Sequence, residues 1–156
     1  MNNVTINAEE MSLPAWSGAV CGFAVKILDE LKCENWELSV LFCGNKTIRN
    51  LNNQYRNIDE PTDILSFNLG ETVKDGDKEA FLPGDIVISL ETLRENAQYF
   101  KISEDEELRR LLIHGILHLN GMDHKTIDSD EPMLALQEEI LNKLNKEHII
   151  PAGGKD

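Results

Sequence analysis

The chain has 156 residues, of which 41% are hydrophobic, and a formal net charge of −13. This length suits one domain with a sizeable core, and no apolar run approaches the roughly 20 residues that cross a bilayer. The first residues lack a basic start followed by an apolar core, so we expect no signal peptide and a cytoplasmic protein. The acidic charge argues against a nucleic-acid binder, which is usually basic, unless a local basic patch makes the contact.

The cysteines give no sign of a disulfide or metal framework. Cys21, Cys33 and Cys43 are an odd number, widely spaced, and no two of them form a Cys-x-x-Cys pair. Cys21 and Cys43 lie among apolar residues, and a cytoplasmic environment keeps thiols reduced. We therefore expect three reduced, buried thiols.

The first third of the chain alternates strand and helix patterns. A short strand is expected at residues 4–6, and apolar residues at helical spacing predict a helix over residues 13–31, with Pro14 in its first turn. Alternation of period two predicts a strand over residues 36–42. A second helix is expected to open at residues 44–45, with an apolar stripe that includes Ile48, Leu51 and Tyr55.

The rest of the chain is predicted to add two strands and three helices. Ser103 and Glu106 form a capping-box signature, which predicts the start of the histidine-bearing helix. Gly121 is placed to end that helix, and we expect His148 to be frayed. The other expected ranges are a polar loop at 57–62, a strand at 63–67, an exposed hairpin-like connection at 70–84, a strand at 85–90, and helices at 91–100 and 130–146.

These elements predict an α+β fold. We expect one domain over residues 1–150, with about four strands in a small mixed sheet and about five helices, followed by a flexible tail at residues 151–156. The strand at 85–90 is apolar enough to be central. The histidine-bearing helix is apolar nearly all round, so it should be a buried central element.

Three of the chain's four histidines lie within eleven residues. His114 and His118 are four apart, so a helix places both imidazoles on one face, about one turn apart. Gly121 allows a sharp turn that brings His124 to the same point. Three imidazoles with an open fourth position are typical of a catalytic zinc site. We expect one zinc ion, although nickel and copper also accept imidazole ligands.

The same spacing occurs in metzincin proteases, which carry a glutamate directly after the first histidine as the general base. This chain has Gly115 at that position, which we expect to face the reacting water. The missing carboxylate argues against a metallopeptidase.

The segment from His114 to His124 resembles the signature of the YbeY family, His-Gly-x-Leu-His-Leu-x-Gly-x-Asp-His, at every fixed position. Two further family signatures precede it in the family's order. The first comprises Leu51-Asn52, Tyr55-Arg56 and Thr62-Asp63-Ile64-Leu65-Ser66-Phe67, and the second is Gly84-Asp85-Ile86-Val87-Ile88-Ser89.

The resemblance implies a bacterial metal-dependent endoribonuclease specific for single-stranded RNA. It implies a role in 16S ribosomal RNA 3′-end processing and ribosome quality control, with ribosomal RNA, ribosomal subunits and a ribosomal or GTPase protein as partners. It assigns the metal to His114, His118 and His124, and it matches Arg56 to a functionally important arginine. His114 and Arg56 are therefore the expected catalytic residues.

Several alternatives stay open on the sequence. Arg56 is expected to hold the phosphate, with Lys46 and Arg49 as further basic-patch candidates. The general base is unassigned, Asp123 is placed to orient a histidine or to shape the turn, and either water or the ribose 2′-hydroxyl is the nucleophile. The competing functions are a zinc metallopeptidase or other hydrolase, and a ribosome assembly factor with a structural metal.

Overall fold

A computed structural model of the chain describes residues 1–151 and shows a four-stranded mixed sheet with five helices. The strands lie in the order β1-β2-β4-β3. β1, β2 and β4 are parallel, and β3 runs antiparallel to β4. The α+β prediction is therefore confirmed. The elements are β1 (Asn3–Ala8), α1 (Ser17–Glu30), β2 (Glu37–Cys43), α2 (Asn45–Arg56), β3 (Ile64–Asp75), β4 (Lys78–Ser89), α3 (Leu90–Phe100), α4 (Glu104–Leu119) and α5 (Pro132–Lys143).

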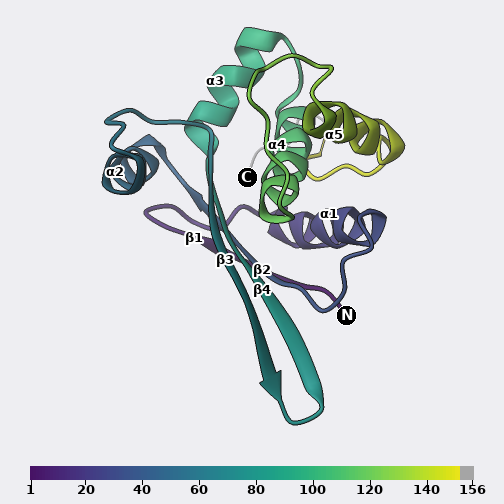
Figure 1. The fold of residues 1–156 in the computed structure, drawn as a ribbon. Helices are drawn as coiled ribbons and strands as arrows, with labels where there is room; N and C mark the ends of the chain where they lie inside the picture. The colour runs from purple at the N-terminus through teal and green to yellow at the C-terminus, as the bar shows by residue number, and fades with distance from the viewer. Residues whose placement is uncertain (152–156) are drawn as a thin grey trace.

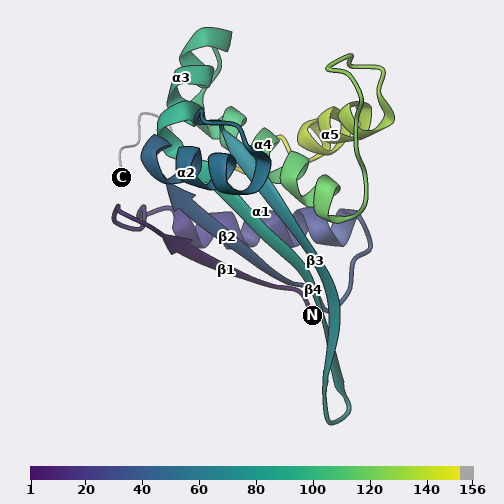
Figure 2. The same cartoon turned by 60° about the vertical axis from the view of Figure 1, so that its left-hand side comes forward.

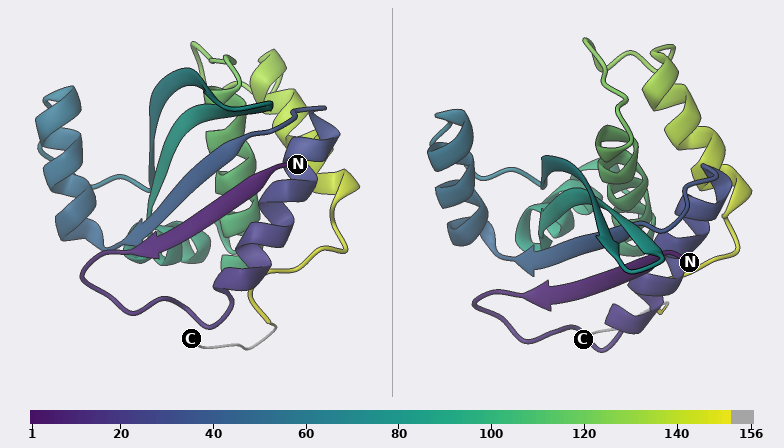
Figure 3. Two further views of the ribbon diagram at one scale, coloured as in Figure 1. Left: turned by 90° about the horizontal axis from the view of Figure 1, so that it is seen from below. Right: turned by 60° about the horizontal axis from the view of Figure 1, so that its bottom comes forward.

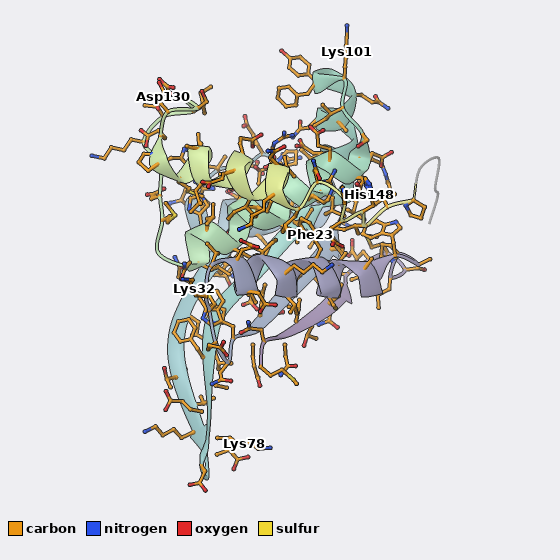
Figure 4. The ribbon with its side chains drawn as sticks, turned by 90° about the vertical axis from the view of Figure 1, so that its right-hand side faces the viewer. Phe23, Lys32, Lys78, Lys101, Asp130 and His148 are labelled. Atoms are coloured by element: carbon orange, nitrogen blue, oxygen red, sulfur yellow. The ribbon has the colours of Figure 1, made fainter. Side chains whose placement is uncertain are left out.

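Helices cover the two faces of the sheet unequally. Figures 2 and 3 show α2 on one face and α1 and α4 on the other, with α5 packed against α4. Because side chains alternate along a strand, Phe42 and Ile88 join the large core cluster with α1 and α4, whereas Cys43 and Val87 join a small cluster with α2. Phe23 of α1 is buried in the large core (Figure 4).

β3 and β4 form a longer hairpin than the sequence indicates. The two strands pair from Ile64 to Asp75, and their outer half projects beyond the helices (Figure 1). Residues 70–84 were expected to form an exposed hairpin-like connection. They do form a hairpin, but most of these residues belong to the paired strands β3 and β4. A register shift lies between Asn68 and Glu71. Residues 68–79 at the outer end of this hairpin are all exposed, so they lack the apolar periodicity that predicts a half-buried strand.

The first helix starts later than expected. It begins at Ser17, whose backbone N–H and side-chain hydroxyl both donate to the carbonyl oxygen of Pro14. Pro14 therefore belongs to the turn before the helix. The expected strand at 4–6 is present and extends over Asn3–Ala8.

The segment after α5 is held in place, which corrects the expectation that His148 is frayed. Ile149 is 3% exposed, and its backbone N–H donates to Asp105 Oδ1 at 2.7 Å. The N–H of Ile150 donates to the same oxygen, and the His148 ring lies 3.1 Å from Asp105 Oδ2. Burial acts to raise the pKa of Asp105, but these hydrogen bonds and Arg109 outweigh it and keep the pKa below its usual value. Residues 152–156 of the expected tail lie outside the described residues.

Two expectations from composition have clear outcomes. Within residues 1–151, no helix is long and apolar enough to cross a membrane. All three cysteines are free thiols; Cys33 and Cys43 are buried, whereas Cys21 is only half-buried. Burial raises the pKa of each thiol, to about 11 for Cys43, which keeps these groups protonated at neutral pH.

Candidate metal centre

The structure brings three histidines from two segments to one point. His114 and His118 lie one turn apart on α4, with their Nε2 atoms 3.0 Å apart. His124 comes from the loop after the helix, and one ring nitrogen from each residue lies within 4.8 Å of the others. All three residues are partly exposed, so the cluster is open to solvent on one side.

The turn after α4 is built by hydrogen bonding and by a glycine. At the start of α4, the hydroxyl of the N-cap residue Ser103 accepts a hydrogen bond from the Glu106 backbone N–H, and the Glu106 carboxylate accepts one from Arg110. At the other end, Gly121 has φ 91° and donates to the His118 carbonyl oxygen, and the Met122 N–H donates to the Leu117 carbonyl oxygen. These two bonds form a Schellman motif, which requires the left-handed conformation that glycine adopts at low cost. The predicted role of Gly121 is confirmed.

Two imidazole rings are held by partners on their Nδ1 atoms. His114 Nδ1 lies 2.6 Å from Gln137 Oε1, and His124 Nδ1 lies 2.7 Å from the Thr126 carbonyl oxygen. Both partners are acceptors only, so each Nδ1 carries the hydrogen and each Nε2 keeps its lone pair. Gln137 Nε2 donates to Glu138 Oε2 at 3.1 Å, which fixes the orientation of the amide. Gln137 is buried on α5, far along the chain, and sequence reasoning missed it.

Asp123 shapes the turn. Its Oδ1 accepts the backbone N–H of His124 at 2.8 Å and lies 3.9 Å from His118 Nδ1, which is too long for a hydrogen bond. Burial is the main cause that lowers the pKa of both His114 and His118, and the neighbouring imidazoles add to it. Both rings are therefore neutral at pH 7 and their lone pairs are available.

The donor set fits a divalent metal that accepts imidazole nitrogen. A tetrahedral zinc ion with Zn–N distances of about 2.0–2.1 Å places its nitrogen ligands about 3.3 Å apart. The three ring nitrogens lie within 4.8 Å of one another, so small ring rotations would bring them to that separation. Within residues 1–151, this is the one group of three or more His, Cys, Asp or Glu residues that meets this distance.

Position 115 faces the sheet, which corrects the expectation that it faces the reacting water. A Cβ atom on Gly115 would lie 2.9 Å from Ile86 Cδ1 and 3.0 Å from Ile64 Cδ1. The glycine allows α4 to approach β3 and β4 closely. The residue thus contributes to packing behind the metal centre, and its lack of a carboxylate is explained by this contact.

Arg56 is the last residue of α2, and α2 packs on the face of the sheet opposite α4 (Figure 2). Arg56 is exposed and makes no side-chain hydrogen bond or ion pair with residues 1–151. Arg49, another basic-patch candidate, forms two hydrogen bonds to Asp59, at 2.9 and 3.2 Å. Its charge is compensated, whereas the guanidinium of Arg56 is available for a ligand.

Known proteins match this chain along most of its length. The family model Endoribonuclease YbeY matches residues 3–145. A protein named Endoribonuclease YbeY from Treponema pallidum is 47% identical over 142 residues, covering 90% of this chain and 89% of the relative. Its namesake from Treponema denticola is 51% identical over 120 residues, covering 76% and 77%.

The fold also matches a solved structure. The solution structure of TM1509 from Thermotoga maritima superposes with a TM-score of 0.62 at 25% identity and covers 98% of this chain and 97% of that one. The resemblance found in the sequence is therefore confirmed, and the chain belongs to the YbeY endoribonuclease family.

Proposed function

We propose that the protein is a zinc-dependent endoribonuclease that cuts single-stranded RNA during maturation of the 16S ribosomal RNA 3′ end. One observation carries this proposal: a chain of the YbeY family holds three imidazoles around one point that is open to solvent. The reaction breaks a phosphodiester bond of the RNA. The same activity serves ribosome quality control in the cytoplasm.

His114, His118 and His124 hold the single zinc ion in this proposal. Zinc supplies a positive charge that polarises a phosphoryl oxygen and activates the attacking group. The contribution of the protein is orientation: Gln137 and the Thr126 carbonyl oxygen fix two of the rings with Nε2 directed inward. His114 acts in catalysis as a ligand whose position depends on α5.

Arg56 is the proposed phosphate contact. Its guanidinium has no hydrogen-bond or ion-pair partner among residues 1–151, and a planar fork of N–H donors suits two phosphate oxygens. Because α2 lies across the sheet from α4, Arg56 would bind a phosphate remote from the cut bond and hold the RNA strand in register. This use of remote contacts is how an enzyme places a long substrate.

Because the chain has a net charge of −13, we expect a partner protein to help it bind RNA. Ribosomal RNA and ribosomal subunits are the proposed partners, and a ribosomal protein or a GTPase is proposed to present the RNA. Such a partner would offset the long-range repulsion between an acidic chain and a polyanion.

The experiment compares zinc-loaded wild-type protein with His114→Ala and with His148→Gln, which changes the one histidine outside the cluster. Each is incubated with a single-stranded RNA, the same sequence as a duplex, and casein. We expect cleavage of the single strand by the wild type and His148→Gln, and a loss of about 1000-fold in His114→Ala, as for removal of a group central to catalysis. Cleavage of casein would favour a metallopeptidase. Stoichiometric zinc with no cleavage, together with binding to ribosomal subunits, would favour an assembly factor with a structural metal.

A further inference from the structure

Four side chains at intervals of four residues form one stripe along α4. In chain order they are Glu106, Arg110, His114 and His118. Because residues four apart lie on the same face of a helix, the two histidines continue a row that begins with an ion pair. The Arg110 guanidinium is half-buried and donates from Nη1 to Glu106 Oε2 at 3.1 Å. α5 packs on α4 and supplies the other partners of Arg110 and His114.

Arg110 holds the carboxylate of Glu138 on α5 with two parallel hydrogen bonds. Its Nε donates to Oε2 and its Nη2 donates to Oε1, each at 3.0 Å. Such a fork fixes the plane of a carboxylate, which a single contact does not. Burial acts to raise the pKa of Glu138, but the hydrogen bonds from Arg110 and Gln137 outweigh it and keep the pKa below its usual value. Glu138 is therefore an ionised acceptor held in one orientation.

The Glu138 carboxylate decides which end of the Gln137 amide faces His114. Glu138 Oε2 accepts from Gln137 Nε2 at 3.1 Å, which leaves Gln137 Oε1 2.6 Å from His114 Nδ1. The opposite amide orientation would place two acceptors against each other at Glu138, with no hydrogen between them. It would also point the amide NH2 group at His114 Nδ1, so the ring hydrogen would have to sit on Nε2. In that tautomer the nitrogen that faces His118 has no lone pair for a metal.

We propose that Arg110 is a positioning residue of the metal centre, which acts through Glu138 and Gln137 to keep the His114 ring in the tautomer that can bind a metal. The inference deepens the proposed function and rests on it for the use of the metal in RNA cleavage. The bond between Arg110 and Glu138 also joins α4 to α5. The metal centre depends on the acceptor that this bond holds beside Gln137, and not on the attraction between the two helices.

Reversing the ion pair separates these two roles. In the double variant Arg110→Glu with Glu138→Arg, opposite charges still face each other between α4 and α5. A group with donors only now lies beside Gln137 in place of the acceptor. The amide should therefore turn, so that its oxygen faces the guanidinium introduced at position 138 and its NH2 group faces His114 Nδ1. The single variant Glu138→Gln removes the preference for either orientation, since its own amide can donate or accept.

The first readout is zinc affinity, measured by competition with a chromophoric chelator. We expect it to fall roughly 10- to 100-fold in the reversed pair and about 10-fold in Glu138→Gln, as for other groups that orient a metal ligand. Glu30→Gln is the matched control and should bind zinc as the wild type does, because it breaks the 2.7 Å ion pair to Lys143 that joins α5 to α1. Wild-type affinity in the reversed pair or in Glu138→Gln, or an equal loss in the control, would overturn the proposal.

The second readout follows the His114 ring itself and needs no RNA. Histidine is labelled with ¹⁵N, and the shifts of the ring nitrogens in metal-free protein show which nitrogen carries the hydrogen. The His114 signals are assigned by their absence in His114→Ala. We expect the hydrogen on Nδ1 in the wild type and on Nε2 in the reversed pair. A hydrogen on Nδ1 in both would refute the inference, whereas failure of the wild type to cut RNA would refute only the proposed function.

Discussion

The two faces of the sheet differ in how much they are packed, and the candidate site divides between them. On one face, α1 and α4 enclose the large core that contains Phe42 and Ile88, and the histidine helix is part of that core. On the other face, α2 covers a small cluster of Cys43, Ile48, Leu65 and Val87. Beside α2 a groove of about 440 Å³ stays open, with Tyr55, Phe67 and Asp85 among its lining residues.

The two faces of the sheet suit different functions. Metal binding needs ligand atoms held to within tenths of an ångström, which a packed helix with buried partners provides. Contact with a long substrate needs exposed groups, and Arg56 lies on the open face. The comparison therefore predicts that changes on the α4 face affect metal and stability, whereas changes on the α2 face affect RNA alone.

Among changes that leave the three histidines intact, the largest expected effect is on the open face. Arg56→Ala should lower cleavage of single-stranded RNA by roughly 100-fold, the scale expected when loss of a remote contact misplaces the substrate by about 1 Å. Zinc content and the free energy of unfolding should stay unchanged, because the guanidinium has no partner in the described part of the chain, residues 1–151. Arg49→Ala is the matched control: its charge is already paired with Asp59, so cleavage should change little. Equal losses in the two variants would show that only general basic charge on α2 is used.

An intermediate effect is expected from the residue that holds His114. Gln137→Ala should weaken zinc affinity about 10- to 100-fold, because the His114 ring loses the acceptor that fixes its tautomer. Competition with a chromophoric chelator measures the affinity. A variant that binds zinc as tightly as the wild type would show that the packing of α4 alone orients the ring.

The smallest expected effect concerns the contact between α4 and the sheet. Gly115→Ala adds a Cβ that would lie 2.9 Å from Ile86 Cδ1, so the free energy of unfolding should fall by about 1–3 kcal/mol. Gly22→Ala on α1 is the control, since nothing lies within 4 Å of its added Cβ and alanine favours a helix by about 1 kcal/mol. Urea unfolding of both variants gives the comparison. A neutral Gly115→Ala would mean that Ile64 and Ile86 move aside freely.

The sequence predicts the α4 site well because its signals are local. The spacing of His114 and His118 and the glycine at position 121 act within one helix and one turn, and the structure reproduces both. Gln137 was missed because its role depends on a contact between two elements. Nothing in the neighbouring sequence of Gln137 shows that α5 packs on α4 with this side chain directed at His114.

Errors in the fold prediction have the same origin. The β3–β4 arm pairs its strands through backbone hydrogen bonds and buries little, so hydrophobic periodicity does not reveal it; Lys78 lies at its exposed tip (Figure 4). The segment from His148 to Ile150 is short, and Asp105 holds it from more than forty residues away. The protease-like histidine spacing led to the expectation that position 115 faces the reacting water. In the structure, the close contact of α4 with the sheet leaves no room for a side chain there.

The most direct test of the account is the metal content of purified protein, measured by mass spectrometry for the wild type, the three single histidine-to-alanine variants and Arg56→Ala. We expect about one zinc ion per chain in the wild type and in Arg56→Ala, because three imidazoles with an open fourth position hold one ion without Arg56. Each of His114→Ala, His118→Ala and His124→Ala should lose most of it. Full zinc content in any of the three histidine variants, or its loss in Arg56→Ala, would contradict the division of the site between the two faces.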